Sequence, residues 1–228
     1  MRISEIFTSV QGEGTLAGVP SVFIRTTGCN LRCVWCDTPY TSWQPEGSAM
    51  NLDEILVEVR RQAQIRHAVV TGGEPMIAPG IAQLTGMLRD AGLHVTIETA
   101  GTVGAPVACD LMSISPKLAN STPLERDGGR WAMWHEQRRY RPEVLRALMA
   151  GYEYQLKFVV AAPGDLEEIG RILHELDAPP ERVCLMAEGI TPETLRERGT
   201  WLWDLCIREG YRYSPRLHVD LFGDRRGV

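Results

Sequence analysis

The sequence lacks any hydrophobic run of membrane-spanning length, and it lacks an excess of positive charge. Its longest apolar stretches, such as residues 158–162, are strand-sized, whereas a membrane-spanning helix needs about 20 apolar residues. The 24 basic residues are outnumbered by 29 acidic ones, so the net charge is −5. Because nucleic acids are bound through clustered Lys and Arg, this balance argues against such a surface. We therefore expect neither a membrane nor a nucleic acid as a partner.

The first residues, MRISE, also lack the features of a targeting segment, because an acid follows at once and no apolar run of signal-peptide length is present. We therefore expect a cytoplasmic protein, whose thiols stay reduced. Cysteines are few, six in all. Cys109, Cys184 and Cys206 are scattered singly among apolar neighbours, which predicts small buried hydrophobes rather than a disulfide framework.

What the chain does have is an alternation of strand-length runs and segments of helical periodicity. Runs of strand length occur at residues 21–26, 67–71, 93–98, 110–115, 154–160 and 182–187, and the chain closes with another at 216–222. A helix is expected over about 79–91. Other helix starts are marked by capping patterns at Asn51 with Glu54, Asp165 with Glu168, and Thr191 with Pro192. The expected apolar stripes are Leu52, Ile55, Leu56, Val59 and Ala63, and Leu166, Ile169, Leu173 and Leu176.

This alternation predicts an α/β fold, with a parallel sheet and helices outside it. The chain has about six strand–helix units, which are too few for a complete eight-stranded barrel but suit a partial TIM-type barrel. A doubly wound open sheet is the alternative. No segment resembles a linker, so we expect one domain over residues 1–228. Residues 118–141, with two tryptophans and several arginines, have weak periodicity. We interpret them either as a surface excursion or as a lid or dimer-contact element.

Three cysteines, Cys29, Cys33 and Cys36, are concentrated in the stretch GCNLRCVWCDTPYTSW. Thiolates select zinc, copper(I) or iron–sulfur clusters. Structural zinc usually takes four ligands in two pairs, but a second pair is missing here, since His67 and Cys109 stand alone. The C-x3-C-x2-C spacing favours a [4Fe–4S] cluster held at three corners, whose fourth iron can bind another molecule. A zinc-stabilised binding module without catalytic activity is the alternative from a different class.

The cysteine spacing, with Trp35 before the last cysteine, resembles the signature of radical S-adenosylmethionine (radical SAM) enzymes. The stretch TGGEP at residues 71–75 resembles the glycine-rich motif of that superfamily, which receives the methionine amino group of the cofactor. The pair Glu98-Thr99 and the stretch SPK at residues 115–117 end the next two predicted strands. Because the carboxyl ends of strands build the active site of α/β barrels, we expect these motifs in one layer.

The stretches EIFTSVQGEGTLAGVP, CDT, SPKLANSTP and LHVDLFGDRRGV narrow the resemblance, which extends over residues 5–228. They closely resemble the 7-carboxy-7-deazaguanine synthase family. The resemblance implies a radical SAM lyase that converts 6-carboxy-5,6,7,8-tetrahydropterin to 7-carboxy-7-deazaguanine with loss of ammonia, on the route to 7-deazapurines such as queuosine. In that reaction a 5′-deoxyadenosyl radical takes hydrogen from C6 of the pterin. An activase that installs a glycyl radical on a partner protein is the nearest alternative, but it leaves QGEG and CDT unexplained.

The resemblance also implies the cofactors, the partners and the site residues. The cofactors are a [4Fe–4S] cluster, S-adenosylmethionine and Mg²⁺; the partners are a one-electron donor protein of the flavodoxin or ferredoxin type and a second copy in a homodimer. The cluster ligands are Cys29, Cys33 and Cys36, and the Mg²⁺ ligand is Thr38. The residues that contact S-adenosylmethionine are Trp35, Cys36, Asp37, Gly73, Glu74, Ser115, Pro116 and Lys117. Those that contact the substrate are Val10, Gln11, Gly12, Glu13, Arg25 and Thr71.

Two of these expectations have a physical basis in the residue type. Arg25 ends the first predicted strand, and its fork can pair with the substrate carboxylate through two parallel hydrogen bonds. Mg²⁺ keeps several waters or substrate oxygens, so the single hydroxyl of Thr38 suffices as its protein ligand. Lys157 and His218 also lie near strand ends, but we expect structural or solvent-facing roles for them.

Overall fold

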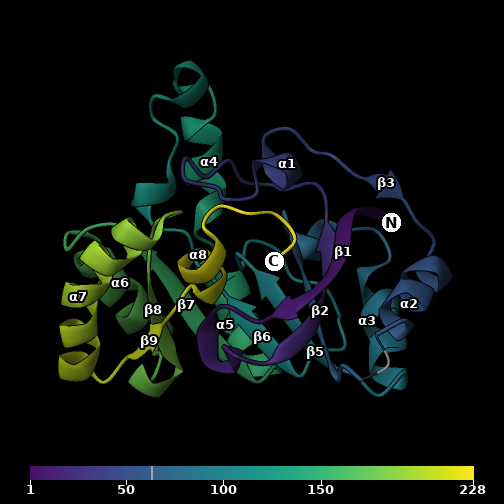
Figure 1. Ribbon diagram of the computed structural model, residues 1–228. Coiled ribbons are helices and arrows are strands. Elements are labelled where there is room, and N and C mark those ends of the chain that lie inside the picture. Colours follow the sequence, from purple (N-terminus) through teal and green to yellow (C-terminus); the bar gives the residue numbers. More distant parts are fainter. Residues whose placement is uncertain (63) are drawn as a thin grey trace.

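The computed structural model describes residues 1–62 and 64–228, and these form a nine-stranded sheet of order β3-β1-β2-β4-β5-β6-β7-β8-β9 (Figure 1). The strands are β1 (Arg2–Val10), β2 (Pro20–Thr26), β3 (Ser48–Ala49), β4 (His67–Gly72), β5 (His94–Thr99), β6 (Leu111–Ile114), β7 (Tyr154–Val160), β8 (Val183–Ala187) and β9 (Arg212–Ser214). From β2 through β4 to β9 the neighbours pair in parallel. The strand β1 is antiparallel to β2, and β3 to β1. The predicted α/β fold with a parallel sheet and helices outside it is confirmed, and the open, mostly parallel sheet agrees with the predicted partial TIM-type barrel.

Helices connect most of the parallel strands and flank the sheet (Figure 1). The α-helices are α1 (Pro39–Ser42), α2 (Leu52–Arg60), α3 (Ile81–Asp90), α4 (Ala132–Arg139), α5 (Pro142–Gly151), α6 (Asp165–Leu176), α7 (Pro192–Glu209) and α8 (Leu217–Phe222). Short 3₁₀ turns are η1 (Gly14–Leu16), η2 (Pro75–Ile77), η3 (Ala119–Ser121), η4 (Arg126–Gly129) and η5 (Pro180–Arg182). In the described part of the chain, no helix has both the length and the apolar character that a membrane span requires.

The capping signals have mixed outcomes. Asn51 and Glu54 form the predicted capping box at the start of α2, and the hydroxyl of Thr191 caps α7 ahead of Pro192. The predicted box at α6 is wrong, because Asp165 accepts hydrogen bonds from the preceding loop instead. Its intended partner, Glu168, reaches away from the cap to a neighbouring segment. The stripe residue Ala63 lies outside the described residues.

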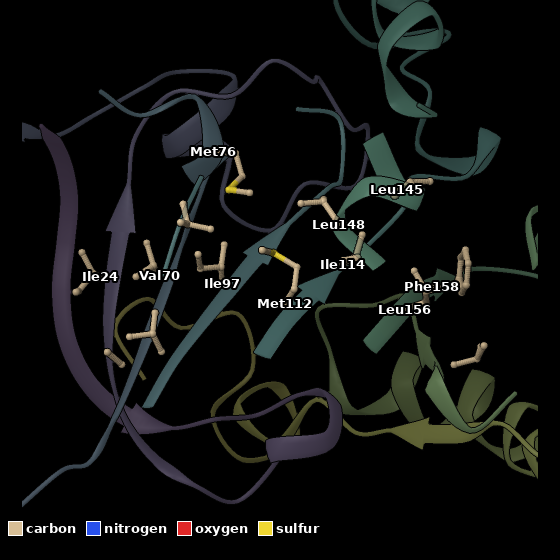
Figure 2. Close-up of a cluster of buried hydrophobic side chains, with 14 of the residues drawn as sticks. Ile24, Val70, Met76, Ile97, Met112, Ile114, Leu145, Leu148, Leu156 and Phe158 are labelled. Atoms are coloured by element: carbon tan, nitrogen blue, oxygen red, sulfur yellow. The ribbon is translucent and has the colours of Figure 1, made fainter. Parts of the chain in front are cut away.

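The core is built from successive parallel strands and the helices against them (Figure 2). The buried strand side chains include Ile24, Val70, Ile97, Met112, Ile114, Leu156 and Phe158. Leu145 and Leu148 of α5 pack near Ile114 in the same cluster (Figure 2). The strands β2 and β4 to β8 are largely buried on both faces, which explains their continuous apolar runs rather than alternating ones. Cys184 and Cys206 are buried and Cys109 is half-buried, and all three are free thiols.

Three differences from the expected elements concern the two ends of the sheet. The antiparallel strand β1 is half-buried, so it lacks the apolar run that marks the parallel strands. The last parallel strand, β9, has only three residues. The closing run at 216–222 forms the helix α8, so its expectation as a strand is wrong. The reason is tertiary: β9 already occupies the sheet edge, and the Leu217 amide bonds the carbonyl of Gly12 instead of another strand.

Candidate active site

A cavity of about 460 Å³ opens at the carboxyl ends of the parallel strands. It is lined by most of the residues that the sequence predicts for the site, namely Val10, Gln11, Gly12, Glu13, Arg25, Cys29, Cys33, Trp35, Cys36, Asp37, Thr38, Thr71, Gly73, Ser115 and Lys117. Only Glu74 and Pro116 of the predicted set do not line it. The predicted convergence of the motifs in one layer is therefore confirmed, as expected for a parallel sheet whose loops gather at one edge.

The three cysteines of the loop between β2 and α1 face this cavity. Cys33 is buried, and Cys29 and Cys36 are half-buried. Burial raises the pKa of Cys33 to about 12, despite the opposing charge of Lys117, and burial together with the nearby Cys33 raises that of Cys29 as well. As free thiols Cys29 and Cys33 would stay protonated, so a bound cation is needed to stabilise their thiolates.

The donor set fits an iron–sulfur cluster better than a single metal ion. Within residues 1–62 and 64–228, no three His, Cys, Asp or Glu side chains gather closely enough to hold one ion. Yet three sulfurs line the same cavity, which suits a wider group with several metal atoms. Within the loop, the Leu31 amide donates a hydrogen bond to the Cys29 sulfur at 3.3 Å, an arrangement that would stabilise this sulfur as a thiolate.

The glycine-rich turn after β4 packs directly on the cysteine loop. A side chain at Gly73 would place its Cβ 2.1 Å from the carbonyl oxygen of Gly28. The Glu74 amide donates to that same oxygen at 2.9 Å. The backbone contact explains why this turn requires glycine.

Glu74 is fully buried beneath the turn. Its carboxylate accepts hydrogen bonds from the Thr99 hydroxyl at 2.8 Å, the Ala100 amide at 2.9 Å and the Met76 amide at 3.1 Å. Burial raises the pKa of Glu74, and these hydrogen bonds oppose the rise. The carboxylate thus ties the end of β4 to the end of β5 and does not face the cavity, in contrast to the expected contact with the cofactor.

The SPK stretch forms the wall next to Trp35. The Lys117 ammonium donates to the Ser115 hydroxyl at 2.7 Å and lies 5.6 Å from the centre of the Trp35 ring. Pro116 is buried between them. Ser115, Lys117 and the indole therefore lie together, as the resemblance implies.

A buried ionic network that the sequence did not predict lies on the opposite wall. Glu13 pairs with Lys157 of β7 and with Arg216, whose Nε lies 3.0 Å from the carboxylate. Arg216 also donates to the Gly189 carbonyl at 2.6 Å and pairs with Asp37. Burial alone would raise the pKa of Glu13, but the charges of Lys157 and Arg216 outweigh it and hold the pKa well below its usual range. All three groups are therefore charged at neutral pH.

One sequence signal could have indicated this network. Lys157 interrupts an otherwise apolar strand, and a charged side chain in a buried strand needs a partner. The sequence predicts a structural or solvent-facing role for Lys157 and His218. In the structure both side chains line the cavity, together with Arg216. Arg216 carries no such signal, because it is the first residue of the run 216–222, for which the pattern predicts a strand that closes the chain.

A second hydrogen-bonded set joins predicted substrate residues through Glu98. Its carboxylate accepts from the Gln11 amide at 3.0 Å and from the Thr71 hydroxyl at 2.8 Å. The Gln11 side-chain carbonyl in turn accepts from the Glu13 amide at 3.2 Å. Glu98 lines the cavity and orients both neighbours before any ligand binds.

Arg25 is held by its Nε, which donates to Glu5 at 2.7 Å, while its guanidinium lies 5.5 Å from the centre of the Phe7 ring. The Nε contact leaves the two terminal nitrogens of the fork for a ligand. Glu5 also accepts from the Tyr40 hydroxyl at 3.0 Å and from Arg226 at 3.2 Å. Because residues 223–228 line the same cavity, the tail lies along its mouth.

The segment 118–141 braces the cysteine loop from outside. The Arg32 amide donates to Nδ1 of His135 at 3.1 Å, and the other ring nitrogen pairs with Ser121 at 2.9 Å. Burial lowers the pKa of His135 to about 4, so the ring is neutral and can accept this bond. The Val34 amide donates to the Ser121 carbonyl at 2.8 Å. The segment therefore contacts the loop that carries the three cysteines, and its role as a lid or a dimer contact stays a prediction.

Comparisons with known proteins agree with this geometry. Residues 23–117 match the radical SAM superfamily. A 7-carboxy-7-deazaguanine synthase of Rhodopirellula baltica is 48% identical over 100% of this chain and 89% of its own length. One of Halobacterium salinarum is 45% identical over 98% and 91%. The crystal structure of QueE from Escherichia coli has a TM-score of 0.70 at 28% identity, covering 95% of this chain and 94% of that one.

These matches extend over nearly the whole chain. They confirm the predicted family, a [4Fe–4S] cluster and S-adenosylmethionine as its cofactors, and an enzyme rather than a zinc-stabilised module. The activase alternative is set aside on the same ground. The chain belongs to the 7-carboxy-7-deazaguanine synthase family of radical S-adenosylmethionine enzymes.

Proposed function

We propose that this protein converts 6-carboxy-5,6,7,8-tetrahydropterin to 7-carboxy-7-deazaguanine with loss of ammonia. The observation that carries the proposal is a single cavity in which three cysteines face the predicted substrate residues. We propose further that residues 1–228 act as one domain in the cytoplasm, where six free thiols are stable. The homodimer rests on the family resemblance alone.

The residues divide into a cofactor wall and a substrate wall. Cys29, Cys33 and Cys36 would hold the cluster, with S-adenosylmethionine against Trp35, Asp37, Gly73, Ser115 and Lys117. When bound, these groups supply reductive cleavage of a carbon–sulfur bond and abstraction of a hydrogen atom from carbon. Glu74 supports this wall from behind by fixing the glycine-rich turn.

The substrate wall is ordered in advance. Gln11 and Thr71 both donate hydrogen bonds to the Glu98 carboxylate, so little side-chain entropy is lost when a ligand binds. Their oxygens and amides, with the backbone of Val10 and Gly12, suit the donor–acceptor edge of an aminopyrimidinone. Lys157 and Glu13 keep fixed opposite charges there. Burial lowers the pKa of Lys157, but Glu13 and Glu98 raise it by more, so Lys157 serves as a stable cation rather than as a base.

The reaction is tested by anaerobic incubation of the reconstituted enzyme with the carboxylated pterin, S-adenosylmethionine, dithionite and Mg²⁺. We expect 7-carboxy-7-deazaguanine and ammonia in equal amounts, identified by mass spectrometry and an ammonia assay. Cleavage of S-adenosylmethionine without any deazaguanine would show a radical SAM enzyme with another substrate.

Replacing Arg25 by alanine is expected to raise the KM for the pterin about 10–100-fold, because a charge-assisted hydrogen-bonded pair contributes about 1.5–3 kcal/mol. Steady-state kinetics would measure it, with the iron content as a control for the cluster. Arg25→Lys keeps the positive charge but loses the planar guanidinium, so its KM should lie between that of the unmodified protein and that of Arg25→Ala. An unchanged KM in Arg25→Ala would exclude the carboxylate contact.

Thr38 is proposed as the Mg²⁺ ligand. Thr38 lines the cavity, and its hydroxyl makes only long hydrogen-bond contacts in the described residues, with Thr41 Oγ1 at 3.5 Å and the Cys36 sulfur at 3.8 Å, so it can serve a hard cation as an oxygen ligand. Thr38→Ala is expected to lose the stimulation by added Mg²⁺ and at least about tenfold in kcat, which corresponds to about 1.4 kcal/mol. Thr38→Ser retains the hydroxyl and should retain the response. A normal Mg²⁺ response in Thr38→Ala would contradict the assignment.

A further inference from the structure

The outer side of segment 118–141 carries a group of arginines and tryptophans that the catalytic site does not use. We call it the arginine–tryptophan face, and it consists of Arg126, Arg130, Trp131, Met133, Trp134 and Arg138. It surrounds α4, which projects beyond the body of the sheet (Figure 1).

Its side chains are stacked and in part strongly exposed. The Arg130 guanidinium lies 4.7 Å from the centre of the Trp131 ring, and that of Arg138 lies 4.4 Å from the centre of Trp134. The two indoles meet edge to face at 5.6 Å. Met133 beside them is 74% exposed. Trp, Met and Arg are the residue types enriched where proteins contact one another, and Trp and Arg are frequent energetic centres of such contacts.

The Arg32 side chain of the cysteine loop lies between the two tryptophans of this face and the backbone of that loop. The Arg32 guanidinium lies 5.1 Å and 5.5 Å from the ring centres of Trp131 and Trp134. The same guanidinium donates to the carbonyl oxygens of Cys29 at 2.9 Å and Leu31 at 2.7 Å. A protein seated on the tryptophans therefore lies next to the site of the cluster, on the side away from the substrate cavity.

The charge of the segment selects among the partners that could occupy the face. Residues 118–141 contain five arginines and three acidic residues, whereas the whole chain has a net charge of −5. An acidic protein would thus be repelled by the net charge of the chain and attracted by the net positive charge of this segment, which orients its approach. A second copy is disfavoured, because a two-fold contact would place this positive face against itself.

We propose that the arginine–tryptophan face is the docking surface for the acidic protein that supplies the electron for the reaction. The proposal rests on the proposed function, since reductive cleavage of S-adenosylmethionine consumes one electron. That electron leaves the reduced carrier, which is oxidised by one unit, and enters the cluster, which is reduced by one unit. No bond or proton changes in this step. Contacts of this kind are small and short-lived, below about 1,200 Å² of buried surface.

The test replaces arginines that do not touch the cysteine loop. Arg130→Glu combined with Arg138→Glu reverses the charge of the face and leaves Arg32 and Arg126 in place. The matched control is Arg171→Glu combined with Arg196→Glu, which makes the same charge change at exposed positions of α6 and α7. The probe is a flavodoxin of acidic pI. Two quantities are measured on the cluster-loaded enzyme: the Kd for the oxidised flavodoxin by calorimetry, and the rate of cluster reduction by the reduced flavodoxin.

We expect the face variant to bind about tenfold more weakly and to be reduced about tenfold more slowly at low ionic strength, with little difference from the control in 0.5 M salt. Equal binding and equal reduction rates in the two double variants would overturn the proposal. So would a change in the sedimenting mass of the face variant, which would make the face an interface between copies. Turnover driven by dithionite should be the same in both variants. If it is absent in the unmodified enzyme as well, the proposed function fails, whereas the docking surface is still judged by the Kd.

Discussion

Replacing Glu13 by glutamine is expected to lower the free energy of unfolding by about 3 kcal/mol, because the buried ammonium of Lys157 loses the carboxylate with which it forms an ion pair and keeps only the more distant charge of Glu98. For a chain of this size that corresponds to a fall in Tm of about 10 °C. Arg216 keeps Asp37 as a partner, so Lys157 accounts for most of the loss. Calorimetry of the metal-free protein would measure it.

A second substitution identifies the cause. In the double variant Glu13→Gln with Lys157→Met the stranded charge is gone, and an apolar side chain fills most of the same space. Buried ion pairs replaced in this way often lose little stability, so we expect the double variant to be more stable than Glu13→Gln alone. A Tm for Glu13→Gln within about 2 °C of the unmodified protein would contradict the buried pair.

The same network predicts a dependence on pH. The folded pKa of Glu13 is held well below its ordinary value of 4.5, so its contribution to stability is fully present above that value. It is lost as the pH falls through the folded pKa. The difference in Tm between the unmodified protein and Glu13→Gln should therefore be largest near neutral pH and should narrow below about pH 4.

Replacing Cys33 by alanine is expected to abolish turnover with little effect on the fold. Cys33 is buried beside Leu31 and Ala100, so loss of its sulfur should cost the metal-free protein about 1 kcal/mol or less. The cluster, in contrast, would lose one of its three protein ligands. We expect loss of bound iron and sulfide, loss of the visible absorbance, and product below detection.

The matched control is Cys184→Ala. Cys184 is also a buried thiol, and burial likewise raises its pKa, but it lies outside the cavity. This variant should keep the iron, the sulfide and the turnover of the unmodified protein. Full iron content in Cys33→Ala would show that Cys33 is not a ligand.

The sequence by itself determined the parallel α/β fold, the cysteine site and the family. The parallel strands are buried on both faces, so each appears as a continuous apolar run. The three cysteines lie within one loop, so their spacing is a local property that survives without knowledge of the fold. The antiparallel β1, the short β9 and the helix α8 escaped prediction because their identity depends on what already occupies the sheet edge.

Only the tertiary structure decided how the site is held together. Glu13, Lys157 and Arg216 are more than 50 residues apart in sequence, and they meet because the segment after β1, the strand β7 and the residue before α8 come together in the fold. Glu74 belongs to the glycine-rich motif that predicts a contact with the cofactor. In the structure its carboxylate is buried and accepts a hydrogen bond from the Thr99 hydroxyl. Ion pairs and buried hydrogen bonds depend on which elements become neighbours, and a single sequence does not state that.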